Sequence, residues 1–444
     1  MASESAPAAT PSAAPASFDG ARPPRSRLRR LSSVVAAPLI VLALLLFANE
    51  LPTGSGLQEG GVTRPVPSAV GISPSPPSVV IVPEPSMPAE PSPSSARPTP
   101  STKTTRSAPP SVGEYLLIER ATLESLPTAG PAWDALVATA DESLGSPDLT
   151  DQDSRHAVQT LGVALVHART GGEAYREKAR RAIMDAIGTE RDGADNSILA
   201  LGRQLAAYVL AADLIGLSGS DDEEFREWLD EIRTHELGGH GRWRALTATH
   251  GDSANNWGAF AGASRIAASL YLGDHEDVWA ASDVLRGFLG DRTAWDAFQP
   301  VGDSADWACE PGRFVPVNPP CTKDGVDLDG AIVRDISRGG RFRWPPGDDG
   351  VRYTLESLQG LTIQAELLRR NGYGDPWSWS DDALRRAADF VTRSGQAGGD
   401  TWNRSWPSYH VPWLINARYG LSLPVVAAEP GRIFGYTDWL YGSR

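Results

Sequence analysis

Apolar residues recur at helical spacing along most of the chain from residue 154 onwards, and short Gly, Pro, Asp or Ser breaks separate the periodic segments. After Trp257, for example, Phe260, Ala263 and Ile266 fall on one helical face. The sequence shows no strongly alternating strand pattern. Helices are therefore predicted from Trp257 onwards and over residues 154–170, 174–190, 196–216, 221–235, 277–291, 354–373 and 380–395.

Many helices with short joints are typical of an all-α fold of antiparallel helix pairs, arranged as a bundle, a solenoid or a closed toroid. Because the sequence carries no fixed-length repeat, we expect an (α/α) toroid or incomplete barrel. One domain over residues 113–444 should form it. The inner helix ends and their loops then form a cleft, where residues that are unusual in helix interiors should lie.

The first 112 residues have a different character. Residues 1–33 are polar and arginine-rich towards their end, and residues 34–49 contain an uncharged apolar run. This run is shorter than the roughly 20 residues of a membrane span, and it fits a signal peptide or a signal anchor. Without a clear Ala-x-Ala site we favour the anchor, with the basic tail inside and the domain on the extracellular side of the membrane; cleavage would give a secreted protein. Residues 50–112 are Pro/Ser-rich and are predicted to be a disordered linker.

The formal net charge of −14 includes the basic tail, so the exported part is acidic, which argues against nucleic-acid binding. The two cysteines, Cys309 and Cys321, lie close together in a Pro-rich stretch. In an exported chain this favours a disulfide that closes a local loop. Two free thiols are the alternative.

The stretch HGDSANNW, residues 250–257, places two Asn residues immediately before a helical pattern. One of Asn255 and Asn256 can cap the helix, and the other can fill the turn or point an amide into a cleft. Trp257 is either core packing or a flat face for a sugar ring. His235 and His240 in HELGGH are five residues apart, whereas H-E-x-x-H zinc motifs place their histidines four apart, so no metal site is predicted. We expect His240 and His250 to be loop histidines near the Asn pair.

Positive charge is concentrated in residues 334–360, where Gly-Gly and Pro-Pro pairs indicate a shaped loop. The arginines can form surface salt bridges, or they can form a basic wall that binds an anionic ligand. Tyr353 is expected to open the following helix. The five arginines are Arg334, Arg338, Arg341, Arg343 and Arg352.

Two further segments carry candidate chemistry. Residues 402–420 are dense in aromatics and include His410, which fits either C-terminal packing or a sugar platform. Asp327 and Asp329 in GVDLDG are candidates for a hydrolase pair or a calcium loop. Because the full calcium-loop pattern is missing, we expect solvated turn residues there.

The Asn pair and the arginine loop together resemble the alginate lyase superfamily of α/α-toroid polysaccharide lyases. In that family an Asn-Asn-His motif at a helix start precedes an Arg-rich, Gly-containing loop and a Tyr at the head of a helix. The matching pieces here are Asn255-Asn256-Trp257, the R-x-x-x-R-G-G-R run from Arg334, and Tyr353. Segment 196–216 is similar to an inner helix of such proteins. The family's catalytic His is replaced by Trp257, so His250 or His240 would have to take over its role.

The resemblance implies β-elimination on an alginate-like, uronate-containing polysaccharide. The proton removed is α to a carboxylate, whose charge must be neutralised by aimed donors. A Tyr can take this proton and return one to the leaving oxygen. The implied catalytic residues are Asn255 or Asn256 as neutraliser, Arg338 or Arg341 as clamp, Tyr353 as base and acid, and His250.

The resemblance also implies a set of substrate-binding residues, an anionic polysaccharide as partner, no cofactor, no metal and a monomeric protein. Two other functions stay open. The missing motif His allows a non-catalytic cell-envelope glycan-binding protein on the same fold. Carboxylates such as Asp327, Asp329 or Glu356 allow a toroid glycoside hydrolase. The implied substrate-binding residues are Arg203, Tyr208, His240, Trp257, Arg334, Arg343, Arg352 and His410.

Overall fold

The computed structural model describes residues 115–190, 197–239, 242–310, 312–398, 410–426 and 430–442. These residues belong to one compact unit, Arg97–Arg444. The basic tail, the apolar segment and the linker predicted from the sequence lie outside the described residues, and so does His240.

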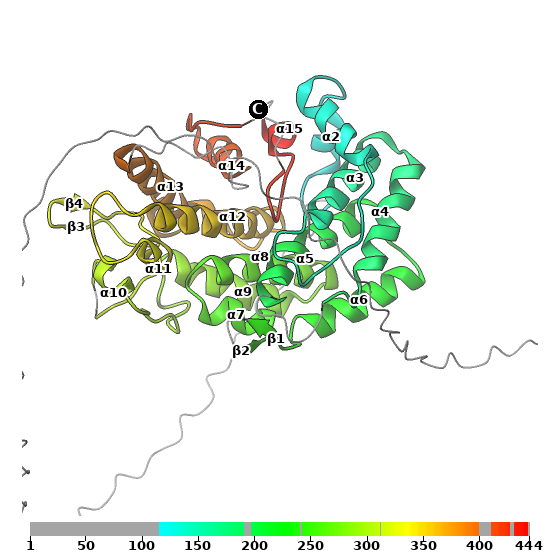
Figure 1. Ribbon diagram of the computed structural model, residues 1–444. Helices are drawn as coiled ribbons and strands as arrows, with labels where there is room; N and C mark the ends of the chain where they lie inside the picture. The colour runs from blue at the N-terminus through cyan, green and yellow to red at the C-terminus, as the bar shows by residue number, and fades with distance from the viewer. Residues whose placement is uncertain are drawn as a thin grey trace, which may run out of the picture. The chain divides into compact units, whose positions relative to one another are not determined.

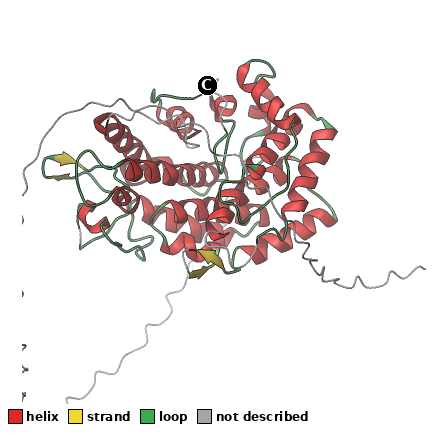
Figure 2. Cartoon of the chain, viewed as in Figure 1, coloured by secondary structure: helices red, strands yellow, loops and turns green. Residues whose placement is uncertain are grey.

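Helices dominate the described part of the chain (Figure 2), which confirms the all-α prediction. Two short antiparallel hairpins join them, β1 (Leu237–Gly239) with β2 (Arg242–Arg244) and β3 (Thr322–Lys323) with β4 (Val326–Asp327). The helices are α1 (Arg120–Ser125), α2 (Pro131–Asp141), α3 (His156–Thr170), α4 (Glu173–Ala186), α5 (Ser197–Leu214), α6 (Ser220–Ile232), α7 (Leu246–Asp252), α8 (Asn256–Leu272), α9 (His275–Leu289), α10 (Ser304–Trp307), α11 (Val333–Ile336), α12 (Asp348–Arg370), α13 (Trp379–Gly398), α14 (His410–Tyr419) and α15 (Thr437–Tyr441), with 3-10 turns η1 (Ser337–Gly339) and η2 (Pro376–Ser378).

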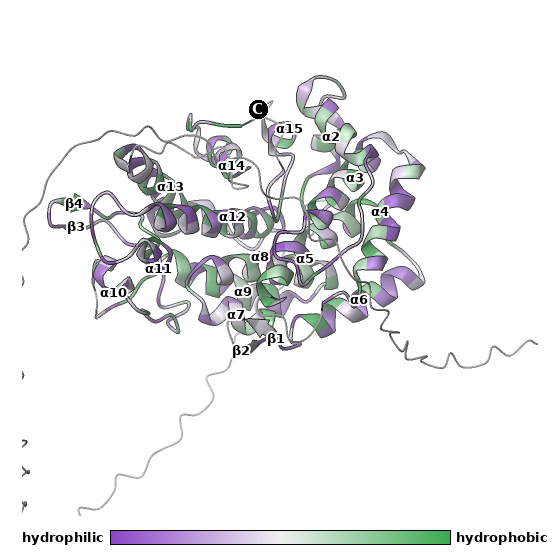
Figure 3. Cartoon of the chain, in the orientation of Figure 1, coloured by the Kyte–Doolittle hydropathy of each residue, from purple (hydrophilic) through white to green (hydrophobic). Residues whose placement is uncertain are grey.

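An inner row of helices runs in the order α3, α5, α8 and α12, each packed against the next (Figure 1). Outer helices return over them after short joints, as α4 does on α3, α9 on α8 and α13 on α12, giving an incomplete toroid of helix pairs. Figure 3 shows mostly hydrophobic residues on α5 and α8 and hydrophilic ones along parts of α4 and α6. Within the described ranges, α5 is the helix long and apolar enough to cross a membrane, but 94% of it is buried inside the unit, as in a core helix.

Several elements differ from the sequence prediction. Helices α1, α2, α7, α10, α11, α14 and α15 are additional, and most of them are too short for a clear apolar period. Helix α12 begins at Asp348, after Pro346 and Gly347, rather than near residue 354. Its first turns are polar, so the sequence pattern concealed them. Tyr353 therefore lies in the second turn of this helix and does not open it.

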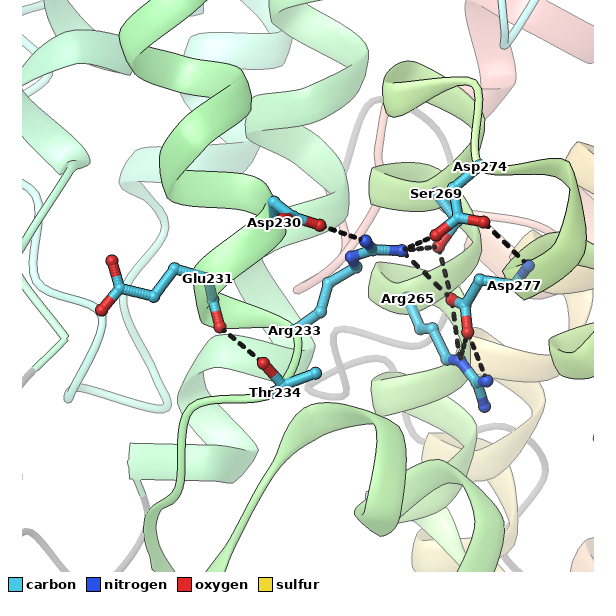
Figure 4. Close-up of polar contacts among 8 residues, drawn as sticks. All are labelled: Asp230, Glu231, Arg233, Thr234, Arg265, Ser269, Asp274 and Asp277. Atoms are coloured by element: carbon cyan, nitrogen blue, oxygen red, sulfur yellow. Dashed lines mark hydrogen bonds and ion pairs between the residues drawn. The ribbon is translucent and has the colours of Figure 1, made fainter.

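A charged network fastens the outer helices α6 and α9 to the inner helix α8 (Figure 4). The Arg233 guanidinium at the end of α6 lies 2.9 Å from an Asp274 oxygen and also binds Ser269. Arg265 on α8 forms an ion pair of 2.6 Å with Asp277 on α9. Because these charged groups each have several partners, the network favours a single packing arrangement of the three helices.

Helices α8 and α12 approach so closely that Gly360 has no space for a side chain. A Cβ there would lie 2.3 Å from the Ala259 carbonyl carbon of α8. We expect Gly360→Ala to lower the free energy of unfolding by about 1–3 kcal/mol or more, because backbone must shift, even though Ala favours helix by up to about 1 kcal/mol. Gly202→Ala is the matched control, since its Cβ would meet Ala261 at 3.2 Å. Urea unfolding of both variants measures the difference, and equal midpoints would contradict the close approach.

Candidate active site

The Asn pair begins helix α8, but neither side chain caps it. Asn255 occupies the cap position in an extended conformation, without a side-chain bond to the helix. Asn256 is the first helical residue, and its backbone N–H donates to Asp335 Oδ1 at 3.3 Å. Because the first N–H groups of a helix lack partners within it, the carboxylate of Asp335 on α11 serves as a cap from another element.

The Asn256 side chain joins a buried network with Glu356 on α12 and Arg203 on α5. Its Nδ2 donates to Glu356 Oε2 at 2.8 Å, and Arg203 Nη2 donates to the same oxygen at 2.6 Å. Only 1% of Asn256 is exposed, with 4% of the Arg203 side chain and 7% of that of Glu356. Arg203, predicted to bind substrate, instead compensates a buried carboxylate.

Two guanidinium groups lie over the aromatic ring of Tyr353. The Arg338 guanidinium stands 3.8 Å from the centre of its ring, and the Arg352 guanidinium 4.7 Å from it. One helical turn further along α12, about 5.4 Å, the Ser357 hydroxyl donates to Asp335. Asp335 thus connects the helix that carries Tyr353 to the start of the helix that carries the Asn pair.

Asp335 is completely buried. Burial raises the pKa of its carboxyl to about 7, while hydrogen bonds from Ser357 and Asn256 and the charges of Arg338 and Arg334 act in the opposite direction. Burial lowers the pKa of the Arg334 guanidinium, the neighbouring Asp335 raises it, and the charges of Arg244 and Arg338 lower it. Positive groups therefore surround the α11–α12 corner.

The raised pKa of Asp335 predicts how stability varies with pH. An unfolded Asp loses its proton near pH 4, whereas the folded chain keeps it to about pH 7. Asp335 therefore contributes stability that is complete below about pH 4 and is lost as the pH rises to about 7, by at most about 1.4 kcal/mol per pH unit. We expect Asp335→Asn to flatten the fall of unfolding free energy between pH 4 and 7 in urea titrations.

In the Asp335→Asn variant, Asp213 should still cause part of the fall in unfolding free energy between pH 4 and 7. Burial raises the pKa of its carboxyl to about 7 as well, although the Leu116 N–H donates to it at 2.7 Å. An Asp335→Asn profile that is parallel to the wild type over the same pH range would contradict the assignment.

The predicted arginines divide into two groups. Arg338 and Arg352 lie over the ring of Tyr353, and Arg334 lies close to Asp335. Arg341 instead turns towards Asp306, with which it forms a 2.9 Å ion pair, and 80% of its side chain is exposed. Arg343 is exposed. Of the two clamp candidates, the structure therefore places Arg338, and not Arg341, against Tyr353.

Two residues predicted to bind substrate, Tyr208 and His410, lie in the core. Tyr208 on α5 is fully buried, with its hydroxyl 2.7 Å from His156 Nδ1. His410 is buried, with its ring edge-on to Phe434. Neither side chain has surface for a polymer to contact. Trp257 is half-buried and packs against the core, which fits the packing interpretation.

His250 was predicted in a loop but lies in helix α7 and is 2% exposed. Burial holds the pKa of its imidazole well below the usual value, and the charge of Arg265 lowers it further, while Asp277 and a hydrogen bond with Gln364 act in the opposite direction. The ring is therefore neutral near pH 7. In this position it packs between helices and cannot replace the missing motif His at an exposed site.

The two carboxylates considered as a hydrolase pair, Asp327 and Asp329, each form a contact with an arginine. Arg386 binds Asp329, and Arg393 lies 3.4 Å from Asp327, both at the β3–β4 hairpin. Within the described ranges, no group of three His, Cys, Asp or Glu side chains could hold a metal ion.

The sequence did not predict Asp335 and Ser357 as site residues. Asp335 contacts Asn256, which lies 79 residues away along the chain, and no local sequence signal indicates such a contact.

A disulfide joins Cys309 and Cys321, whose Cα atoms are 6.0 Å apart. The loop that it closes borders a cavity of about 260 Å³, between the end of α9 and the start of α13. The catalytic candidates do not line this cavity. Apolar residues form much of its wall, including Leu289, Val315, Val317, Pro319 and Pro320.

No protein-family model and no curated protein matches the chain. Among solved structures, a His-to-Ala variant of alginate lyase A1-III in complex with a tetrasaccharide is similar, with a TM-score of 0.48 and 12% sequence identity. The match covers 75% of this chain and 96% of that one. A similarity of this size is a distant likeness in helical architecture and says nothing about the chemistry of the site.

Proposed function

We propose that the chain is a polysaccharide lyase that cleaves a uronate-containing anionic polymer by β-elimination at Tyr353. The observation that carries this proposal is the position of the Arg338 guanidinium, 3.8 Å from the centre of the Tyr353 ring. Helix α12, which carries Tyr353, is connected to the Asn pair through hydrogen bonds to Asp335. A phenol, guanidinium groups and amides at one corner are the groups that proton removal next to a carboxylate requires.

Each group would have a defined task. The arginines around Tyr353 would hold the anionic polymer, since guanidinium groups bind carboxylates bidentately. An amide of the Asn pair would donate to the uronate carboxylate as charge builds on it. Tyr353, reacting as the phenolate, would take the C5 proton on its oxygen, the electron pair of the broken C5–H bond would form the C4–C5 double bond, and the C4–O bond would break. The same Tyr353 oxygen would then return the proton to the leaving oxygen.

The test follows the new double bond directly. The purified full chain, in mild detergent, is incubated with a panel of polyuronates while ultraviolet absorbance of the unsaturated uronate is recorded. We expect an absorbance increase with at least one polymer. A folded protein that gives no increase with any of them would overturn the proposal, and reducing sugars without the chromophore would indicate a hydrolase instead.

A second candidate is a non-catalytic protein that binds the same class of polymer. It is favoured by the burial of His250, the candidate to replace the missing motif His, and by Trp257 at the motif position. In this case the polymer binds to the arginine corner and is never cleaved. Fluorescence titration of the 14 Trp residues with each polymer separates binding from turnover.

We also propose that the chain is exported and held at the membrane by its N-terminal apolar segment, as a monomer. The support is the arginine-rich run before Val34 and the uncharged residues that follow it. A Pro/Ser-rich stretch of about 60 residues, at roughly 3.1 Å per residue, would let the domain reach on the order of 190 Å from the anchor. Such reach suits an enzyme that acts on a polymer outside the membrane.

A further inference from the structure

The chain between η1 and α12 forms a loop that is closed at its base. A Cβ on Gly339 would lie 3.0 Å from the Gly347 backbone nitrogen, so the two ends of the loop touch. We call the chain from Gly339 to Gly347 the closed loop. Trp307 on α10 holds it from one side, because its indole N–H donates to the Gly340 carbonyl at 2.9 Å and its ring lies edge-on to Phe342, with ring centres 5.2 Å apart. These contacts give the closed loop a defined shape.

Trp344 is the exposed aromatic residue of the closed loop. Its exposed fraction is 37%, and no other Trp, Tyr or Phe among the described residues is exposed. The Phe390 ring on α13 packs against its indole, with ring centres 6.1 Å apart. Single exposed apolar side chains are common on protein surfaces, so Trp344 by itself indicates no ligand. The charged groups beside it decide which ligand would fit.

Arg343 supplies an uncompensated positive charge next to Trp344. It is exposed, and within the described part of the chain it forms no ion pair. Its Nη2 would lie 2.8 Å from a Cβ on Gly347, so the guanidinium folds back over the base of the closed loop. Arg341, two residues earlier, is instead paired with Asp306 at 2.9 Å. Of these two arginines, Arg343 is therefore the one whose guanidinium can bind a carboxylate from outside the chain.

Two carboxylates at the start of α12 limit the kind of ligand that can bind here. Asp348 and Asp349 are both exposed, and Arg352 compensates Asp349 at 3.1 Å. Because Asp348 would repel an anion, attraction by charge alone is weak at this place. A suitable ligand must also offer an apolar face to the Trp344 indole. A chain of uronate sugars has both features, since each unit carries a carboxylate and each ring has a face of C–H groups.

The closed loop lies within reach of a polymer bound at Tyr353. Tyr353 is six residues after Gly347, about 9 Å along the helix at 1.5 Å per residue. Trp344 is three residues before Gly347, a span of at most roughly 11 Å. The Cα atoms of Trp344 and Tyr353 are therefore no more than about 20 Å apart, which a chain of several sugar units can bridge.

We propose that Trp344 and Arg343 form a distal subsite for the uronate polymer, in which the indole stacks on a sugar ring and the guanidinium binds a sugar carboxylate. This inference rests on the proposed function, because the polymer is the proposed substrate. The distal subsite holds sugar units away from the bond that is cleaved at Tyr353. It therefore favours long chains over short ones and takes no part in the proton transfers.

The first test compares trimers and octamers of alginate as substrates of the full chain. In the wild type, KM should be lower for the octamer, which reaches the distal subsite. Trp344→Ala should raise KM for the octamer about 5-fold or more, as truncation of a central aromatic contact does. Its kcat and its KM for the trimer should stay at the wild-type values. Trp344→Phe, which keeps a flat ring, should lose less. A Trp344→Ala protein with the wild-type KM for both lengths would overturn the proposal.

The second test compares two arginines of the same loop. Arg343→Met and Arg341→Met each remove one positive charge, so a general effect of net charge on an anionic polymer is the same for both. Calorimetric titration with the octamer should show a Kd that rises about 3- to 5-fold for Arg343→Met, the size of an exposed ion pair, and less than about 2-fold for Arg341→Met. Equal changes in the two variants would overturn the assignment of Arg343.

The same measurements separate this inference from the proposed function. If the wild type binds the octamer without cleaving it, the calorimetric Kd values test the distal subsite while the lyase proposal fails. Turnover of octamers that does not depend on Trp344 leaves the lyase proposal standing and overturns this one. A wild type that neither binds nor cleaves alginate of either length overturns both.

A structural role for Trp344 would give a different result. If Trp344→Ala impairs turnover of trimers and octamers alike, the ring supports the corner around Tyr353 and the distal subsite is refuted. Urea midpoints show whether the variants are folded. Should Trp344→Ala fail to fold, the comparison of Arg343→Met with Arg341→Met decides.

Discussion

Replacing Tyr353 by Phe is expected to lower turnover of the polyuronate by at least two orders of magnitude while the protein stays folded. The change removes only the phenolic oxygen, which is the atom proposed to accept and return the proton. General acid–base catalysis by one side chain typically contributes about 10²- to 10⁴-fold, so kcat should fall by that factor. The ring stays in place, so its contacts with the guanidinium groups of Arg338 and Arg352 persist.

Binding provides the control for Tyr353→Phe. Because the arginines that would hold the polymer are unchanged, the fluorescence titration should give a Kd close to that of the wild type. Tyr353→Ala is a useful partner variant, since it also removes the surface on which Arg338 lies and should weaken binding as well. A Phe variant that retains more than about a tenth of the wild-type kcat would remove Tyr353 from the mechanism.

The helical architecture could be predicted because helix faces are a local property. The apolar period that begins after Trp257 corresponds to α8, and the run around Arg203 corresponds to α5. Prediction failed where the signal was short or polar. Helix α7 has seven residues, too few for a clear period, so His250 was assigned to a loop.

The candidate site was predicted only in part, because its contacts join distant segments. The Asn pair and the arginine loop stood out by composition, and the structure connects them through Asp335. No spacing rule indicates that Glu356 contacts Asn256 across 100 residues. Burial was equally hidden, since Arg203 and Tyr208 were taken as substrate-binding but are enclosed by neighbouring helices.

The second prediction with a large expected effect concerns stability. It tests whether Arg203 stabilises the fold or binds the polymer. Arg203→Met should lower the free energy of unfolding by about 3–5 kcal/mol, because it leaves the Glu356 carboxylate buried without its cation. Glu356→Leu should cost a similar amount, since it leaves the buried guanidinium of Arg203 with only the largely exposed Asp153 carboxylate, 3.9 Å away. It also removes the acceptor of the Asn256 amide. Urea unfolding at pH 7 measures both variants.

The double variant separates a paired charge from two independent contributions. With both charges replaced by apolar side chains, no uncompensated charge remains, so the total cost should be well below the sum of the single costs. The exposed pair of Arg341 and Asp306 is the matched control, and Arg341→Met should cost no more than about 1 kcal/mol. Additive costs at Arg203 and Glu356, or an Arg203→Met protein as stable as the wild type but weaker in binding alginate, would show that Arg203 serves the polymer rather than the fold.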